Sequence, residues 1–197
     1  PNSDLFYLSG IEQEESLLVL FPDCSNPKHR EILFVRQPSE HLKIWEGYKH
    51  SKEDAQKISG IQTVYWTEDF DNIFQLLAAE AEVFYLNDNE HNRAANEVET
   101  REQRFNRKVL KDYPLHKIER LAPHLHDLRF CKSAEETKLI KQAIDVTHRG
   151  FSKVLRMVKP GVTEYEIEAE WAKEFIKRRS KFAYTPIIAS GANACVL

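Results

Sequence analysis

Tyr184-Thr-Pro-Ile-Ile-Ala-Ser-Gly-Ala-Asn-Ala-Cys-Val-Leu197 is the most informative stretch of this chain. Its apolar, β-prone residues are interrupted by the segment Ser190-Gly-Ala-Asn193, a pattern typical of a turn between two strands. Two predicted helices precede this stretch, and Pro160-Gly161 separates them. The order helix, helix, hairpin predicts that a second domain opens here, and we expect most of that domain to lie beyond Leu197.

Both predicted helices begin with the same start signal. Ser133-x-x-Glu136 and Thr163-x-x-Glu166 are capping boxes, in which each side chain bonds the other residue's backbone. We expect the first helix to bury a stripe made of Ile140, Ile144, Phe151, Val154, Leu155 and Val158. The second helix carries Ile167, Trp171 and Phe175 at a spacing of four, so it too should pack one face inward.

The first part of the chain alternates between strand and helix patterns. Short apolar runs at 16–22 and 31–36, separated by turn residues, predict a hairpin, and 63–66 and 82–86 predict two further strands. Thr67, followed by acidic residues, predicts a capped helix that runs to about Glu80. These elements predict an α/β domain whose mixed β-sheet is flanked by helices.

Residues 90–110 are crowded with charge, yet Ala94, Val98, Phe105 and Val109 recur at near-helical spacing and predict a surface helix. The break between the two halves of the chain falls beside the Ser133 cap. We therefore expect an N-terminal domain over residues 1–130 and the truncated start of an α+β domain over residues 131–197.

Composition excludes some classes of partner. The chain has 28 Lys and Arg against 31 Asp and Glu, a net charge of -3, so it offers no general attraction to nucleic acid or to an anionic membrane. No apolar run approaches the ~20 residues that a membrane span needs. Cys24, Cys131 and Cys195 form no Cys-x-x-Cys pair, which favours a reducing, cytoplasmic setting.

Self-contained catalytic motifs are absent from the sequence: there is no Gly-x-Ser-x-Gly elbow, phosphate-binding glycine loop or His-Glu-x-x-His. His124-x-His126, followed by Asp127, is the one cluster that resembles a metal site, and on a strand both imidazoles would share a face. A third ligand at a suitable spacing is missing, so we assign no metal ligand and favour a solvent-facing pair.

Several motifs resemble those of one metallopeptidase family, the Xaa-Pro aminopeptidases (aminopeptidase P), whose pita-bread domain is shared by prolidase and creatinase. The motifs that resemble the start of that domain are Lys132-Ser-Ala-Glu-Glu136, Lys159-Pro-Gly-Val-Thr163 and Ser190-Gly-Ala-Asn-Ala-Cys-Val-Leu197. The motifs that resemble the family's non-catalytic N-terminal domain are Asn2-Ser-Asp4-Leu-Phe-Tyr-Leu-Ser-Gly10, Ile44-Trp45-Glu-Gly47 and Asp127-Leu-Arg129-Phe-Cys-Lys132.

The resemblance implies a metal-dependent exopeptidase that releases the first residue from peptides with proline second. It implies a pair of divalent metal ions, typically manganese, held by two aspartates, a histidine and two glutamates that all follow Leu197. We therefore expect residues 1–197 to hold no such pair and to be inactive alone. A homo-oligomer and a proline-containing peptide substrate are the implied partners.

Four residues match functional positions of the family. The resemblance implies that Asp4 and Arg129 form a relay toward the metal centre, that Tyr184 lies near the cleft, and that Trp45 reaches the substrate of a neighbouring subunit. Each has a structural alternative: an ordinary salt bridge for the Asp4 and Arg129 pair, and core or interface packing for the two aromatic residues. Sequence alone leaves these alternatives open.

Two alternative functions also remain open. A prolidase, which cleaves Xaa-Pro dipeptides, shares the same fold and differs in how much room its pocket leaves beyond proline. Some pita-bread proteins have instead lost their metal ligands and bind peptides or proteins without hydrolysing them.

Overall fold

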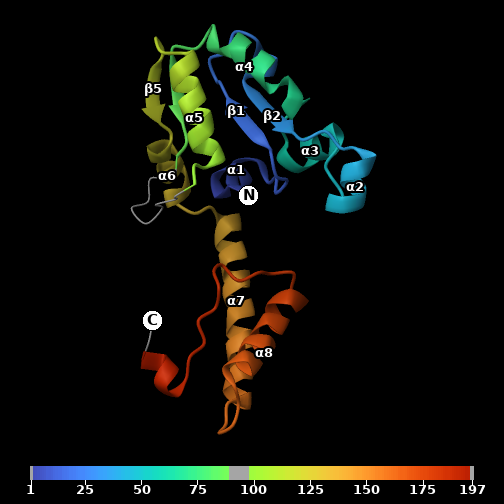
Figure 1. Ribbon diagram of the computed structural model, residues 1–197, viewed down its shortest axis with the longest axis vertical. Helices are drawn as coiled ribbons and strands as arrows, with labels where there is room; N and C mark the ends of the chain where they lie inside the picture. The colour runs from blue at the N-terminus through green and yellow to red at the C-terminus, as the bar shows by residue number, and fades with distance from the viewer. Residues whose placement is uncertain (1, 89–97, 196–197) are drawn as a thin grey trace. The chain divides into compact units, whose positions relative to one another are not determined.

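The computed structural model describes residues 2–88 and 98–195, except for the side chain of Leu42. The chain divides into two compact units, Pro1–Leu128 and Arg129–Leu197. Helices and strands alternate in the first unit, and two helices make up most of the second (Figure 1).

The elements of the first unit follow the alternation that its sequence pattern predicts. Its helices are α1 (Ser3–Ser9), α2 (Glu40–Glu46), α3 (Lys52–Ser59), α4 (Phe70–Ala78), α5 (Arg101–Asp112) and α6 (Ala122–Phe130), whose last residues pass the boundary between the units. Its strands are β1 (Leu17–Leu20), β2 (Glu31–Val35), β3 (Thr63–Trp66), β4 (Val83–Leu86) and β5 (Lys117–Arg120), and the 3-10 turns η1 (Pro27–His29) and η2 (Thr67–Asp69) complete the list.

Three strands form a mixed sheet in the order β1-β2-β3. The predicted hairpin is confirmed, because β1 pairs antiparallel with β2 in a register that sets Leu17 opposite Phe34. β3 pairs parallel with β2, with Ile32 opposite Thr63. The α/β fold with a small mixed sheet and flanking helices is therefore confirmed.

The fourth predicted strand, β4, belongs to a separate two-stranded sheet. It pairs in parallel with β5, with Phe84 opposite Ile118. The sequence pattern missed β5, because Lys117-Ile-Glu-Arg120 contains a single apolar residue and resembles a charged loop.

Strand β2 is the centre of the core. Successive side chains of a strand point to opposite faces, and Ile32, Leu33, Phe34 and Val35 are all fully buried. Leu33 and Val35 pack with Ile11, Ala55, Ile61 and Val64 on one face. Ile32 and Phe34 pack with Cys24, Phe70 and Leu77 on the other face. Helices α3 and α4 thus cover opposite faces of the sheet.

Two predictions about helix starts need correction. Thr67 does not cap a helix with its side chain: it opens the 3-10 turn η2, and α4 begins at Phe70 without a side-chain cap. Burial of Phe70 against Phe34, with ring centroids 5.1 Å apart, favours this start. The charged helix starts at Arg101 with a Thr100 and Gln103 capping box.

Only part of the predicted apolar stripe of the charged helix lies on α5. Phe105 and Val109 pack into a core cluster with Ala78 and Phe84. Val98 precedes the helix and is 79% exposed, and Ala94 lies outside the described residues.

The second unit contains α7 (Ala134–Met157), α8 (Glu164–Lys177) and the 3-10 turn η3 (Gly191–Cys195). Both predicted capping boxes are present, at the starts of α7 and α8. Ile167, Trp171 and Phe175 are half-buried, which agrees with an inward-facing side of α8.

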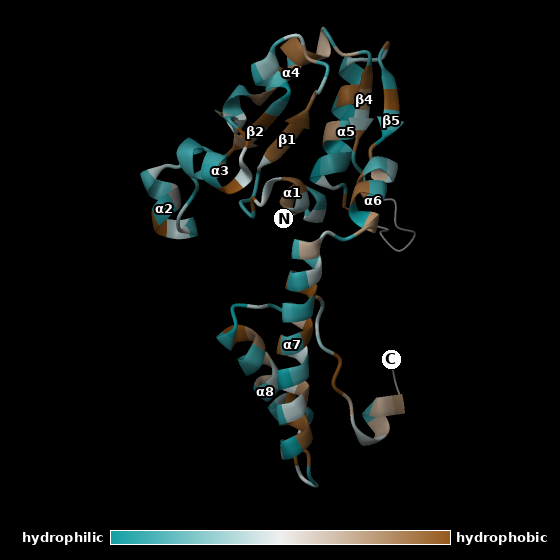
Figure 2. Cartoon of the chain, turned by 180° about the vertical axis from the view of Figure 1, so that it is seen from behind, coloured by the Kyte–Doolittle hydropathy of each residue, from teal (hydrophilic) through white to brown (hydrophobic). Residues whose placement is uncertain are grey.

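The predicted buried stripe of α7 was largely wrong. Val146, Gly150 and Val154 are its buried residues, whereas Ile140, Ile144 and Leu155 are 46%, 60% and 62% exposed. Helix α8 packs along α7, and among the described residues α7 buries only Val146, Gly150 and Val154. Figure 2 shows apolar residues along α7 that lie between hydrophilic ones.

The hairpin expected at 184–197 is not formed in the described residues. This stretch is irregular up to Ser190 and then turns into η3. β-prone residues form strands only where another strand satisfies their backbone groups, and Pro186 also lacks an N–H donor. The described part of the second unit contains no strand that could pair with it.

No helix in the described ranges combines the length and apolar composition that a bilayer crossing requires.

The close contact between α7 and α8 predicts the effect of one substitution. A Cβ atom at Gly150 would lie 2.4 Å from Cδ1 of Trp171. Gly150→Ala should lower the free energy of unfolding by about 1–3 kcal/mol, because overpacking outweighs the gain in helix propensity of about 1 kcal/mol. Thr147→Ala, on the exposed side of α7, is the control and should not destabilise the protein. Chemical denaturation followed by circular dichroism measures both. An increase in the free energy of unfolding for Gly150→Ala would contradict the close contact between Gly150 and Trp171.

Candidate functional site

Trp45 lies on α2 and is open to solvent. Its residue is 76% exposed, as is Ile44, and Tyr48 just after the helix is 70% exposed. The His41 ring lies near the Trp45 ring, with centroids 6.4 Å apart. The alternative that Trp45 packs in the core of the first unit is thereby excluded.

Asp4 and Arg129 lie in different units. Asp4 is half-buried in the first turn of α1, where its backbone N–H donates to the Asn2 side chain at 2.8 Å. Arg129 is half-buried near the end of α6, and its carbonyl accepts a hydrogen bond from Lys132 Nζ at 2.5 Å. A relay that joins the two side chains stays a prediction.

Tyr184 lies in the irregular segment between α8 and η3 and is 78% exposed. The strand expected around Tyr184 is therefore not formed in the described residues, and its place near the cleft stays a prediction.

Glu164, the first residue of α8, holds the turn that follows Tyr184. Its carboxylate accepts hydrogen bonds from the Ser190 backbone N–H at 2.7 Å and from Asn193 Nδ2 at 3.1 Å. The Ser190 hydroxyl donates to the same carboxylate at 3.3 Å. The Ser190 backbone donor, followed by the Asn193 amide, lowers the pKa of the Glu164 carboxyl below its ordinary value.

Sequence reasoning missed Glu164. A signal was available, because the residue directly follows the Thr163 cap, where an acidic side chain suits the positive end of a helix. Its second role, as the acceptor for residues 190 and 193, depends on a contact about thirty positions away that no local pattern encodes.

A buried acid lies between the two helices of this unit. Glu174 of α8 is 2% exposed and pairs with Lys153 of α7. The hydrogen bond from Lys153 lowers the pKa of Glu174. This pair joins α7 to α8, so we interpret Glu174 as a structural residue.

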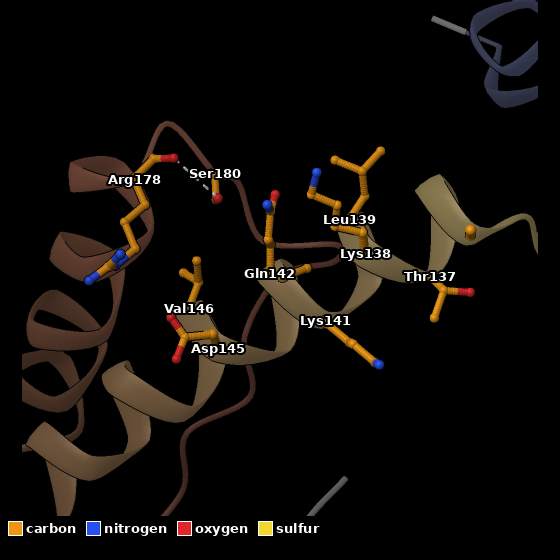
Figure 3. Close-up of a pocket in the computed structure, with 11 residues that line it drawn as sticks. Thr137, Lys138, Leu139, Lys141, Gln142, Asp145, Val146, Arg178 and Ser180 are labelled. Carbon is orange, nitrogen blue, oxygen red and sulfur yellow. Dashed lines mark hydrogen bonds between the residues drawn. The ribbon is translucent and has the colours of Figure 1, made fainter.

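A hollow of about 870 Å³ lies along the first half of α7. Figure 3 shows Arg178 and Ser180, after the end of α8, opposite Asp145 and Val146 of α7. Asp145 is already paired with Arg149 at 2.7 Å. The lining mixes helix side chains of both charges without a nucleophile beside a base, so it does not form a catalytic site.

In residues 2–88 and 98–195, no three His, Cys, Asp or Glu side chains come together in a way that could hold a metal ion. His124 and His126 lie on the helix α6 rather than on a strand. Residues two apart point to different sides of a helix, so the shared face that a strand would give is not formed. Both histidines are exposed, as the favoured solvent-facing pair predicts.

The Glu164 contact gives a prediction with a defined pH sign. Because the folded pKa of Glu164 is lowered, the contact should be complete above the ordinary pKa of 4.5 and lost as the pH falls through the folded pKa. The Ser190 amide and Asn193 side-chain resonances should therefore titrate together in NMR spectra, with a midpoint below 4.5.

Glu164→Gln should shift both resonances at neutral pH and abolish this titration. Glu168→Gln, an exposed position on the same helix, is the control and should leave both unchanged. Separate midpoints for Ser190 and Asn193 would contradict a shared carboxylate.

Two protein-family models match the chain in succession. Residues 1–85 match the aminopeptidase P N-terminal domain, and residues 138–197 match metallopeptidase family M24. Among curated relatives, Xaa-Pro aminopeptidase of Escherichia coli is 26% identical over 200 residues, which cover 100% of this chain and 45% of the relative. Human Xaa-Pro aminopeptidase 3 is 23% identical, with 96% of this chain and 38% of the relative covered.

Solved structures that resemble this chain are also aminopeptidases P. A Bacillus anthracis protein assigned to aminopeptidase P superposes with a TM-score of 0.85 at 31% identity, over 100% of this chain and 47% of that protein. Pseudomonas aeruginosa aminopeptidase PepP gives a TM-score of 0.83 at 27% identity and 44% coverage of its own length. The chain thus spans less than half of the relatives that it matches. With an aminopeptidase P N-terminal domain match followed by an M24 match, the chain resembles an N-terminal fragment of the Xaa-Pro aminopeptidases.

Proposed function

We propose that the whole protein is a metal-dependent Xaa-Pro aminopeptidase, which hydrolyses the bond between the first residue of a peptide and a proline in second position. This chain supplies its N-terminal domain and the first helices of its catalytic domain. We propose bounds of 1–130 and 131–197 for these two parts, which are supported by the compact units 1–128 and 129–197.

One observation carries the proposal. An aminopeptidase P N-terminal domain at residues 1–85 is followed in the same chain by an M24 match at residues 138–197. The match to an aminopeptidase P N-terminal domain supports this activity over other activities of family M24.

The family's name implies a divalent metal, and we propose manganese ions. The described residues do not provide a set of ligands that fits them. What this chain contributes is the support of the site: α7 and α8, and a Glu164 contact that fixes the turn at residues 190–193.

We further propose that Trp45 contacts the substrate bound by a neighbouring copy of the protein. Its 76% exposure and its exposed neighbours Ile44 and Tyr48 support this role, because a flat apolar surface suits a proline ring. Asp4 and Arg129 are proposed as the relay between domains, and Tyr184 as a residue of the cleft. The three free cysteines are compatible with the proposed cytoplasmic setting.

Prolidase activity is the alternative within the same family, and peptide binding without hydrolysis is the alternative outside the enzymes. All three share the fold that this chain forms, so substrate length and turnover must distinguish them.

The assay that tests the proposal uses the full-length protein loaded with manganese. It should release the first residue from a tripeptide with proline second, and it should not act on the matched tripeptide with alanine second. Mass spectrometry of the products measures both. Cleavage of Xaa-Pro dipeptides alone would favour a prolidase. Tight binding of the tripeptide without turnover, with metal present by elemental analysis, would favour the binding module.

Substitution of Trp45 tests the intersubunit role. Trp45→Ala should lower kcat/KM for the proline tripeptide by about tenfold, the equivalent of about 1.4 kcal/mol of lost aromatic contact. Thermal stability should hardly change, because the side chain is exposed.

Ile44→Ala is the matched control for Trp45→Ala, since the two residues are equally exposed on the same helix. It should alter kcat/KM much less. Light scattering on the same samples reports whether the protein is an oligomer, and a monomer of full activity would contradict a substrate contact made across subunits.

A further inference from the structure

The attachment of α2 to the first unit differs from that of its neighbours. Every α2 side chain that the structure describes is exposed, whereas α3 buries Ala55 and α4 buries Phe70, Leu77 and Ala78. In both views α2 lies at the edge of its unit (Figures 1 and 2). Among the described side chains, apolar burial therefore does not hold this helix in place.

Ion pairs at the end of α2 connect this helix to the rest of the first unit. Glu46, its last residue, pairs through Oε2 with Arg36 Nη1 at 2.9 Å and with Lys49 Nζ at 3.2 Å. Arg36 directly follows the buried strand β2, so its position is determined by the core. The end of α2 is thus connected through two cations to the best-packed part of the unit.

The two cations are themselves held by acids from other segments. Lys49 pairs with Glu14, and Arg36 lies 3.5 Å from Glu14 and 3.7 Å from Glu15. Glu15 continues the chain of contacts to Arg101 at the start of α5, at 3.0 Å. We call this set the α2 ion cluster; its members are Glu14, Glu15, Arg36, Glu46, Lys49 and Arg101.

Burial makes the centre of the cluster stronger than a surface pair. The side chain of Lys49 is 7% exposed and that of Arg36 is 25% exposed, and water and salt screen such groups less than fully exposed ones. The hydrogen bond from Lys49 lowers the pKa of Glu14 and raises that of Lys49. Next to Lys49, the His50 backbone N–H donates to the Gln13 side chain at 2.7 Å, which fixes the same segment.

We propose that the α2 ion cluster positions Trp45, because Glu46 anchors the end of α2 to Arg36 and Lys49. Trp45 and Glu46 are adjacent, so the anchor determines the direction in which the exposed indole points. Glu46, Arg36 and Lys49 are then positioning residues for Trp45. The link to catalysis rests on the proposed function, whereas the anchoring of α2 does not.

The test measures backbone hydrogen exchange of α2 in the intact protein. Glu46→Gln should speed exchange of the α2 amides about three- to tenfold at low salt, the range expected for loss of a partly buried ion pair. Exchange in β2 should not change. In the unchanged protein, raising the salt from about 0.05 M to about 0.5 M should speed α2 exchange as well, because screening weakens the pairs.

Glu40→Gln is the matched control. Glu40 lies at the other end of the same helix and pairs with Lys43 at 2.7 Å, outside the cluster. It should change α2 exchange and its salt dependence much less than Glu46→Gln does, because an exposed pair within one helix is weak. Lys49→Gln is a second variant and should reproduce the effect of Glu46→Gln.

Each outcome has one meaning. Equal α2 exchange in Glu46→Gln and Glu40→Gln would overturn the anchor, whatever the protein catalyses. Faster α2 exchange together with a raised KM and an unchanged kcat for the proline tripeptide would support both the anchor and the proposed role of Trp45. Faster exchange with unchanged kinetics would keep the anchor and remove that role from Trp45.

Discussion

Strand β2 must be buried on both faces, and the arrangement of the first unit depends on that constraint. Four consecutive apolar side chains, Ile32 to Val35, cannot be hidden by one layer, because alternate residues point in opposite directions. β1 and β3 satisfy the backbone of β2, while α3 and α4 cover its two faces. The residue after the strand, Arg36, is thereby held at a defined place at the margin of the core.

At the margin of this core, polar contacts rather than apolar packing hold the structure together. α2 lies beyond the reach of both apolar clusters in the described residues, and ionic contacts through Arg36 and Lys49 connect it to the rest of the unit. Such contacts are weaker per residue than core packing and are sensitive to salt. They leave apolar side chains free at the surface, as Ile44 and Trp45 show. The proposed role of Trp45 needs such an exposed surface, held in place without being buried by its own domain.

In the second unit, large apolar side chains stay exposed although its two helices pack together. α7 and α8 form at their capping boxes and pack through Gly150 and Trp171, yet Ile144, Leu155 and Ile176 stay exposed. A helix that packs against one other helix buries only the side that faces its partner, so apolar residues on its other sides remain exposed. The chain spans less than half of its relatives, and the described residues offer no set of metal ligands. Function is thus inferred from the order of the two domain matches rather than from chemistry within residues 1–197.

Local signals in the sequence determined the elements that depend on neighbouring residues: the hairpin at 16–36, the caps at Ser133 and Thr163, and the family motifs at both ends of the chain. Elements that depend on distant partners were decided only by the tertiary structure. β5 forms because β4 lies beside it. Residues 184–190 remain irregular because no strand in the described part of the chain pairs with them. Glu164 has a role because the turn at 190–193 reaches it. The exposure of Trp45 and the ion cluster beneath it belong to the same class. A periodic pattern reports which side chains could be buried, whereas only the packed chain determines what is available to bury them.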